Sequence, residues 1–214
     1  MGAVVTAKGR EIIAGRMRGG TPTQAEPLNL AWGNNPAGLT AATTDVGLFK
    51  EASESRVAGT SSLVTGTTPS DTYQVTGTFT SGSAQSIAEV ALSDSASKPT
   101  AVDTVQAGSA VIGSSSATSL VVTSGANFSV NQYIQVRGEV LKITGISTNT
   151  LTVTRAQNGS TAISTIASGD TVTGGNIPGV SNVTNGSLFF HTDHGAQNLA
   201  SGDQVSYTLS VRFQ

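Results

Sequence analysis

The sequence of 214 residues has no cysteine, few aromatic residues and few charges. The absence of cysteine excludes disulfides, thiolate metal sites and cysteine nucleophiles. Aromatic residues make up 5% of the chain, which argues against a sugar-binding cleft, because such clefts usually offer aromatic stacking platforms. Charged residues make up 11%, against roughly a quarter in a typical globular domain. With so few reactive side chains, the composition disfavours an enzyme.

Long apolar runs and an excess of positive charge are also missing. No apolar run approaches the roughly 20 residues that a membrane helix needs, and no secretory segment follows Met1. The net charge is 11 − 13 = −2, which gives no basis for bulk affinity to nucleic acid. We therefore expect neither a membrane nor a nucleic acid as partner, and synthesis in a bacterial cytoplasm.

Motifs of catalytic and metal sites are absent as well. The only histidines lie in His191-Thr192-Asp193-His194. On a strand, His191 and Asp193 share one face and His194 points to the other, so we interpret this segment as a polar strand end with surface histidines. A metal site would need further ligands supplied by the fold. No G-x-S-x-G, Walker or Rossmann pattern occurs, and the thirteen acidic residues are scattered. We predict no catalytic, cofactor-binding or metal-binding residue, and no cofactor.

The chain instead contains many serines, threonines and glycines, which alternate with valine, isoleucine, leucine and phenylalanine. This period-two pattern is typical of pleated sheet with hydroxyl-rich outer faces. It predicts an all-β fold with strands at residues 28–32, 46–49, 56–64, 73–79, 86–92, 187–192 and 205–213. Ile87 and Val90 are out of phase, which indicates a bulge or a local bend there. In the last strand Val205, Tyr207, Leu209, Val211 and Phe213 share the core face.

The middle of the chain restarts the pattern with shorter strands. Strands are expected at residues 119–123, 133–137, 140–144, 151–154 and 171–173, joined by turns at Gly138-Glu139 and Asn158-Gly159. Segments rich in glycine, proline and serine flank this region. We therefore predict an N-terminal arm at 1–20, an outer β-sandwich domain at 21–102 plus 177–214, and a small inserted β-barrel or sandwich domain at 103–176.

The N-terminal arm is basic and partly apolar. It contains Lys8, Arg10, Arg16 and Arg18, and a short helix over residues 7–17 would bring Ile12, Ile13 and Met17 close together. An exposed apolar stripe flanked by like charges favours a docking element, so these seven residues are the predicted partner contacts. Two alternatives stay open: the arm is a solvated basic tail, or it packs on its own domain and completes the core.

Several sequence blocks are similar to those of a family of small structural proteins from tailed phages. They are the opening Met1-Gly2-Ala3-Val4-Val5-Thr6-Ala7-Lys8-Gly9, Ala31-Trp32-Gly33, the stretch Leu48-Phe49-Lys50-Glu51-Ala52-Ser53-Glu54-Ser55-Arg56-Val57-Ala58-Gly59-Thr60, Asp71-Thr72-Tyr73-Gln74-Val75, Gly77-Thr78-Phe79-Thr80, Ile87-Ala88-Glu89-Val90-Ala91-Leu92 and Leu199-Ala200-Ser201-Gly202-Asp203-Gln204-Val205. The resemblance covers most of the two outer pieces. The middle piece resembles a separate phage insertion module, and short versions of the family lack it.

The resemblance implies a jelly-roll-like sandwich and a place in a virion. The leading expectation is a capsid cement protein that sits as a homotrimer on the outer capsid surface and binds the major capsid protein. The alternatives are a tail-fibre or baseplate component, and a receptor- or glycan-binding module with the insert as reader. We expect no enzymatic activity in any of these roles.

Overall fold

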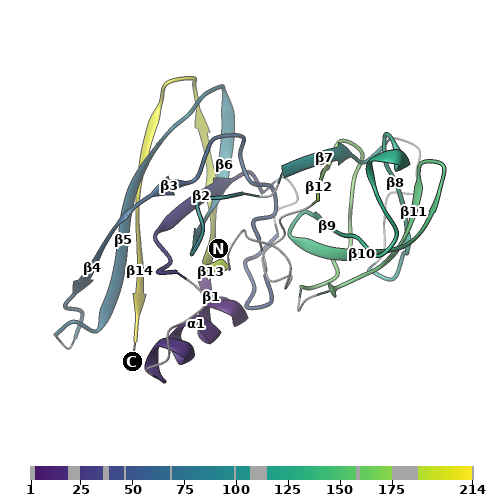
Figure 1. Cartoon of the computed structure of the whole chain (residues 1–214). Coiled ribbons are helices and arrows are strands. Elements are labelled where there is room, and N and C mark those ends of the chain that lie inside the picture. The colour runs from purple at the N-terminus through teal and green to yellow at the C-terminus, as the bar shows by residue number, and fades with distance from the viewer. Residues whose placement is uncertain are drawn as a thin grey trace.

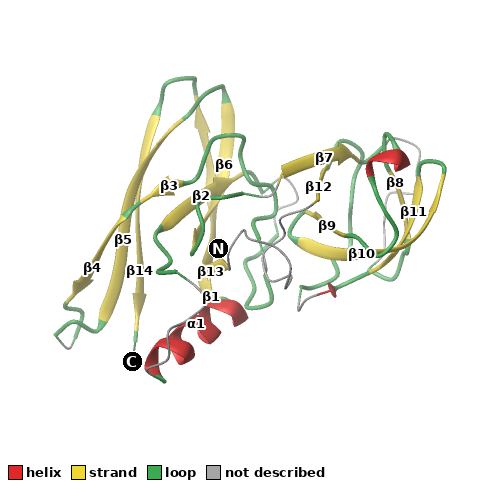
Figure 2. Cartoon of the chain, viewed as in Figure 1, coloured by secondary structure: helices red, strands yellow, loops and turns green. Residues whose placement is uncertain are grey.

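The computed structural model describes residues 3–18, 25–35, 39–45, 47–67, 69–98, 100–106, 115–157, 160–174 and 188–213. Two antiparallel sheets form a jelly-roll-like β-sandwich, and a third, curled sheet lies beside it (Figure 1). Apart from a single α-helix and short 3-10 segments, the regular structure described is strand (Figure 2). The predicted all-β fold class is confirmed.

The sandwich has a five-stranded and a three-stranded sheet. The first has the order β1-β13-β6-β2-β3 and the second the order β14-β5-β4, with antiparallel pairing throughout. Apolar side chains from both sheets meet between them, with Trp32 stacked on Phe79 at 4.5 Å between ring centroids. The strands are β1 (Ala3–Val5), β2 (Asn29–Gly33), β3 (Val57–Ala58), β4 (Thr60–Val64), β5 (Thr72–Thr80), β6 (Gln85–Ser93), β13 (Leu188–Leu199) and β14 (Gln204–Arg212).

The alternation in the last strand is confirmed. In β14, Leu209 and Val211 are buried while Ser210 and Arg212 are exposed. Phe213 follows the strand and is 48% exposed, so the core face ends before it. Nine consecutive residue pairs join β14 to β5, which fixes the C-terminal segment in the sandwich.

Helix α1 (Ala7–Met17) has the bounds that the sequence predicts. Thr6 caps its first turn, because its hydroxyl accepts a hydrogen bond from the Gly9 amide at 3.0 Å. The Thr6 hydroxyl also donates to the Leu188 carbonyl, and β1 pairs with β13, so both connect the segment to the sandwich. Ile12 is 1% exposed and belongs to the sandwich core.

The curled sheet is the insert, which we define as residues 100–174. Its strand order is β7-β12-β9-β10-β11-β8, and a bridge between Val105 and Val122 brings the two edges together. A separate hydrophobic cluster fills its interior. The elements are β7 (Thr100–Thr104), β8 (Ser119–Val121), the 3-10 helix η1 (Gly125–Asn127), β9 (Tyr133–Val136), β10 (Glu139–Ser147), β11 (Thr150–Thr154) and β12 (Thr171–Gly174).

The chain leaves and rejoins the sandwich at neighbouring points, since Ser93 at the end of β6 pairs with Leu188 at the start of β13. β7 pairs with β12 inside the insert and begins at Thr100, three residues before the predicted boundary at 103. The predicted boundary at 177 and the turn at Asn158-Gly159 lie outside the described residues.

Three local predictions need correction. The expected strand at 46–49 is wrong, because none of residues 47–49 lies in a strand and the Phe49 amide donates to a side chain rather than to a strand. The turn between β9 and β10 is Arg137-Gly138, one residue earlier than predicted. The irregularity expected near Ile87 is located on the neighbouring strand β13 and not on β6. Asp193 pairs with Glu89 and Gln197 with Ile87, so β13 contains the extra residues.

Candidate functional site

The outer face of the five-stranded sheet is covered by a loop. Ala31, Ala91 and His191 lie side by side in the register of β2, β6 and β13, and Gly33, Glu89 and Asp193 form the next row on the same face. The covering loop, residues 39–50, lies over these rows; residue 46 is outside the described part. Gly33 permits this close approach, because a Cβ there would lie 2.4 Å from the Lys50 carbonyl oxygen.

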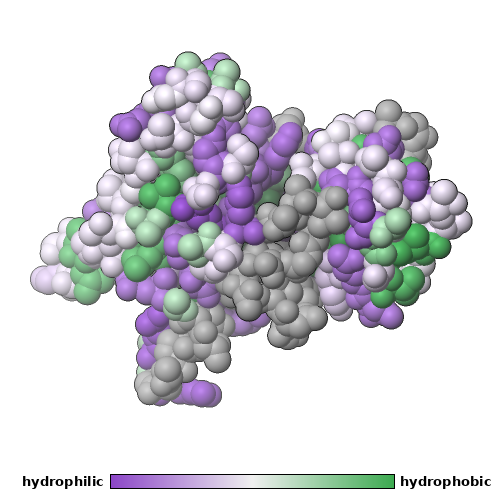
Figure 3. Space-filling view, turned by 45° about the horizontal axis from the view of Figure 1, so that its top comes forward, coloured by the Kyte–Doolittle hydropathy of each residue, from purple (hydrophilic) through white to green (hydrophobic). Residues whose placement is uncertain are grey.

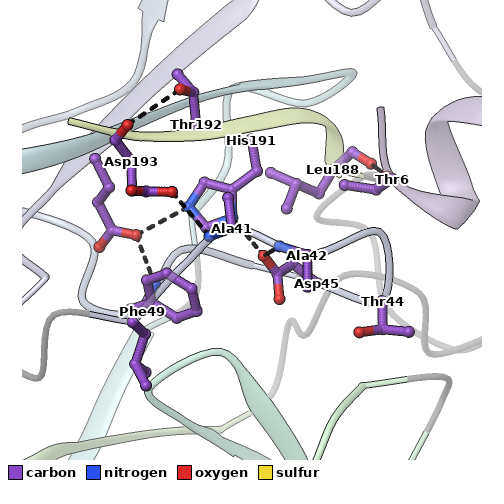
Figure 4. Close-up of polar contacts among 12 residues, drawn as sticks. Thr6, Ala41, Ala42, Thr44, Asp45, Phe49, Leu188, His191, Thr192 and Asp193 are labelled. Carbon is purple, nitrogen blue, oxygen red and sulfur yellow. Dashed lines mark hydrogen bonds and ion pairs between the residues drawn. The ribbon is translucent and has the colours of Figure 1, made fainter. Parts of the chain in front are cut away.

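His191 is the centre of a buried polar cluster (Figure 4). Its ring is completely buried, with Nδ1 2.7 Å from Asp45 Oδ2 and Nε2 3.1 Å from Glu89 Oε2. Phe49 packs against the imidazole with 4.9 Å between ring centroids. The prediction that the histidines are surface residues is therefore wrong for His191. His194 is partly buried and 3.2 Å from the Tyr207 hydroxyl.

Carboxylates in this cluster fix the backbone of the covering loop. Glu89 accepts hydrogen bonds from the Phe49 amide at 2.9 Å and the Lys50 amide at 2.8 Å. Three further bonds hold the first half of the loop: Asp45 accepts from the Ala42 amide at 2.7 Å, Asp193 from the Ala41 amide at 2.9 Å, and Asn35 from the Leu39 amide at 2.8 Å.

The electrostatics favour a protonated His191. Burial alone would lower the pKa of His191, but the hydrogen bonds and charges of Asp45 and Glu89 outweigh it and raise the pKa to about 9. An imidazolium can donate from both ring nitrogens at once, which is what the two flanking carboxylates require. The cluster therefore holds one cation between two anions at neutral pH.

This arrangement connects structural elements and offers no open reaction centre. Each ring nitrogen of His191 faces its own carboxylate, so the three side chains do not converge on a common point. In the part of the chain that the structure describes, no group of three or more His, Cys, Asp or Glu side chains is placed to hold a metal ion. Sequence reasoning missed the cluster, because Asp45 and Glu89 lie 146 and 102 residues from His191.

A hollow of about 610 Å³ lies between the sandwich and the insert. Its charged lining residues mostly have partners: Arg137 pairs with Asp170 at 2.7 Å, and the Lys98 ammonium donates to three backbone carbonyls. Gln135 also lines it, and its Nε2 is buried without a hydrogen-bond partner. A Cβ at Gly47 would lie 2.2 Å from that Nε2, so the Gln135 amide packs against the covering loop.

The insert has its own buried ion pair. Arg155 Nη2 lies 2.6 Å from Glu139 Oε2, and the Glu139 side chain is completely buried. Glu139 also accepts hydrogen bonds from the Ala156 and Ile163 amides, both at 3.0 Å. Arg155 donates in addition to the Ala117 and Ile163 carbonyls. These contacts fasten the loops of the insert to β10.

The predicted contact residues on α1 are separated by the fold. Ile12 is buried in the sandwich, so it is not available to a partner in this structure, and the expectation for this residue needs correction. Ile13 is half-buried, and Lys8 pairs with Glu11 at 2.8 Å. The exposed side of the helix contains the remaining contacts, Arg10, Arg16, Met17 and Arg18. Within the described residues, no helix is long and apolar enough to cross a membrane.

Comparison with protein-family models gives no match for the chain, and the searches of curated proteins and of solved structures give none either.

Proposed function

We propose that this chain is a non-enzymatic structural protein of a tailed-phage virion, and that it acts as a capsid cement protein. The observation that carries the proposal is the way in which α1 is mounted. Ile12 and Gly9 are buried against the sandwich, whereas Met17 is 83% exposed, the highest value among the exposed large hydrophobic residues described. A helix fixed in this way presents an apolar contact that its own domain leaves uncovered.

The exposed side of α1 combines this apolar contact with positive charge. Arg10 and Met17 are seven residues apart and therefore lie on one side of the helix, and Arg18 extends the same exposed surface. We infer that the partner is the major capsid protein, and that its surface offers carboxylates around an apolar recess. The ion pairs contribute little individually, about 0–1 kcal/mol each, so burial of Met17 supplies most of the contact free energy.

The remaining surface agrees with a role in contact and assembly. The outer face of β5 and β14 carries hydroxyl and amide side chains that pair across the strands, such as Thr78 with Ser206 at 2.6 Å and Gln74 with Ser210 at 3.1 Å. On the face that Figure 3 shows, the described residues are mostly polar or near-neutral in colour, with several green patches. A trimer of such a protein would bind several capsid subunits at once, so that individually weak contacts give a high overall affinity through effective concentration. Because it would bind the assembled lattice and not the free subunits, its binding would stabilise the shell.

The copy number per virion tests the proposal. Quantitative mass spectrometry of purified particles should give hundreds of copies, in a fixed ratio to the major capsid protein. A handful of copies would place the chain in the tail, and its absence from particles would refute a virion role.

A binding assay on undecorated capsids then tests the helix. Truncating residues 2–18 is unsuitable, because it would remove β1 and the buried Ile12. The point variants Arg10→Glu and Met17→Ser leave the buried side of α1 intact. We expect Met17→Ser to reduce decoration about tenfold or more, and Arg10→Glu to reduce it less and only at low salt. Lys142→Glu, on the insert, is the control and should decorate normally. Normal decoration by both helix variants would exclude α1 as the contact.

A further inference from the structure

The covering loop has a second role, because the insert rests on it. Gly138, in the β9–β10 turn, approaches the loop so closely that a Cβ there would lie 3.2 Å from the Gly47 carbonyl oxygen. The Gln135 amide packs against Gly47, and the hydroxyls of Thr44 and Thr161 form a hydrogen bond. One side of the loop thus binds the His191 cluster, and the other side contacts the insert.

We propose that the covering loop is a proton-dependent latch: loss of the proton from His191 releases the Asp45 end of the loop and frees the insert to move against the sandwich. This inference is independent of the proposed virion role. It is a property of the buried cluster and of the two contacts that the loop makes.

The chemistry of the imidazole determines which end is released. A neutral imidazole has one N–H and one lone pair, so it can donate to only one of its two carboxylates. Glu89 has a completely buried side chain and receives two loop amides, whereas Asp45 has a 10% exposed side chain and receives one. The remaining proton therefore stays on Nε2 toward Glu89, and the Nδ1 lone pair then repels the Asp45 carboxylate.

The groups that face His191 from each neighbouring element support this assignment. β6 supplies Glu89, the covering loop supplies Asp45, and β13 itself supplies Asp193, whose Oδ1 is hydrogen-bonded to the Ala41 amide. β2 supplies no titratable group in this row. Displacement of Asp45 also loosens the Ala42–Asp45 turn, which contains Thr44 and its contact to Thr161.

A distance measurement tests the latch directly. The chain has no cysteine, so spin labels can be attached to the full-length protein at Thr208→Cys in the sandwich and Ser147→Cys in the insert. Double electron–electron resonance should give a narrow distance distribution at pH 7 and a broad one above the titration of His191. NMR of the imidazole carbons gives that titration midpoint in the same protein. A distribution that stays narrow through the titration overturns the proposal.

Two variants separate the latch from other effects of alkaline pH. Asp45→Asn removes the carboxylate charge that the unprotonated Nδ1 would repel, so the distribution should stay narrow at all pH values. His194→Gln removes the other histidine, and its distance distribution should broaden with the same pH midpoint as in the wild-type protein. The mechanism is refuted if the distance distribution of Asp45→Asn broadens at the wild-type pH midpoint, or if that of His194→Gln does not broaden.

Amide shifts in the wild-type protein give a test that needs no variant to fold. The Ala42 amide shift should follow the His191 titration, because its acceptor Asp45 moves away. The chemical shifts of the Phe49 and Lys50 amides, which donate to Glu89, should change much less over the same titration. The reverse pattern would contradict release at the Asp45 end.

Discussion

The sandwich and the insert each bury one glutamate completely, but they neutralise it with different cations. Glu89 in the sandwich faces His191, and Glu139 in the insert faces Arg155. Both carboxylates also receive two backbone amides from loops, so each holds loop segments against a sheet. The arrangements are similar, although the two regions have separate hydrophobic cores.

The difference between the two cations determines when each region loses its charge pair. Arginine keeps its charge over the pH range in which histidine titrates, so the pair in the insert is permanent over that range. Histidine titrates in an accessible range, so the pair in the sandwich is conditional. The same structural device thus has a fixed form in one region and a pH-sensitive form in the other.

The largest effect is expected when the permanent pair is broken. Arg155→Met leaves Glu139 buried without its cation and should destabilise the insert by about 3–5 kcal/mol. Chemical denaturation followed by NMR signals of the insert measures this loss. The control is Arg212→Met in the sandwich, where the partner Asp71 is 3.1 Å away and the arginine side chain is 34% exposed. Followed on signals of the sandwich, loss of this pair should cost about 1 kcal/mol or less. Equal effects of the two variants would show that burial of the pair is unimportant.

The next largest effect is the pH dependence of the sandwich. The folded-state pKa of His191 is about 9, above the ordinary value of 6.5, so protonation stabilises the fold. This contribution, about 3 kcal/mol, is fully present below pH 6.5, declines as the pH rises and is lost above about pH 9. Denaturation midpoints between pH 6 and 10, followed on signals of β6 and β13, measure it.

The insert is the internal control for this pH dependence. Its signals should show little change in stability between pH 6.5 and 9, because its buried glutamate is paired with an arginine and not with a histidine. His191→Gln should remove most of the slope from the sandwich and lower its stability at pH 7. A slope that persists in this variant would mean that another group causes it.

Local pattern was sufficient to predict the elements that depend on neighbours in sequence. The alternation from Val205 to Val211 predicted β14, and the four-residue spacing of Ile13 and Met17 suited the helix that forms. Burial of Ile12 could not be predicted in the same way, because it depends on β13, more than 170 residues further along the chain. The arm thus packs on its own domain through Ile12, one of the two alternatives to docking.

The buried cluster depends on contacts that no local pattern contains. One signal for His191 was present: Leu188, Phe189 and Phe190 precede it without alternation, which is typical of a strand buried on both faces. A histidine that continues such a strand is expected in the interior. Its partners could not be identified, since Asp45 lies on a loop whose sequence suggested a strand.

The smallest effect is expected from removing the insert altogether. The two hydrophobic clusters share no residue. Because Ser93 pairs with Leu188, residue 99 can be joined directly to residue 175 after deletion of residues 100–174. The deletion should start at residue 100, because β7 belongs to the sheet of the insert. What the sandwich loses is the contact of Gly47 and Thr44 with the insert, so its free energy of unfolding should change by about 1 kcal/mol or less. Circular dichroism and hydrogen exchange measure this change. A shortened chain that fails to fold cooperatively would show that the sandwich needs the insert, and that the two glutamate clusters belong to one unit.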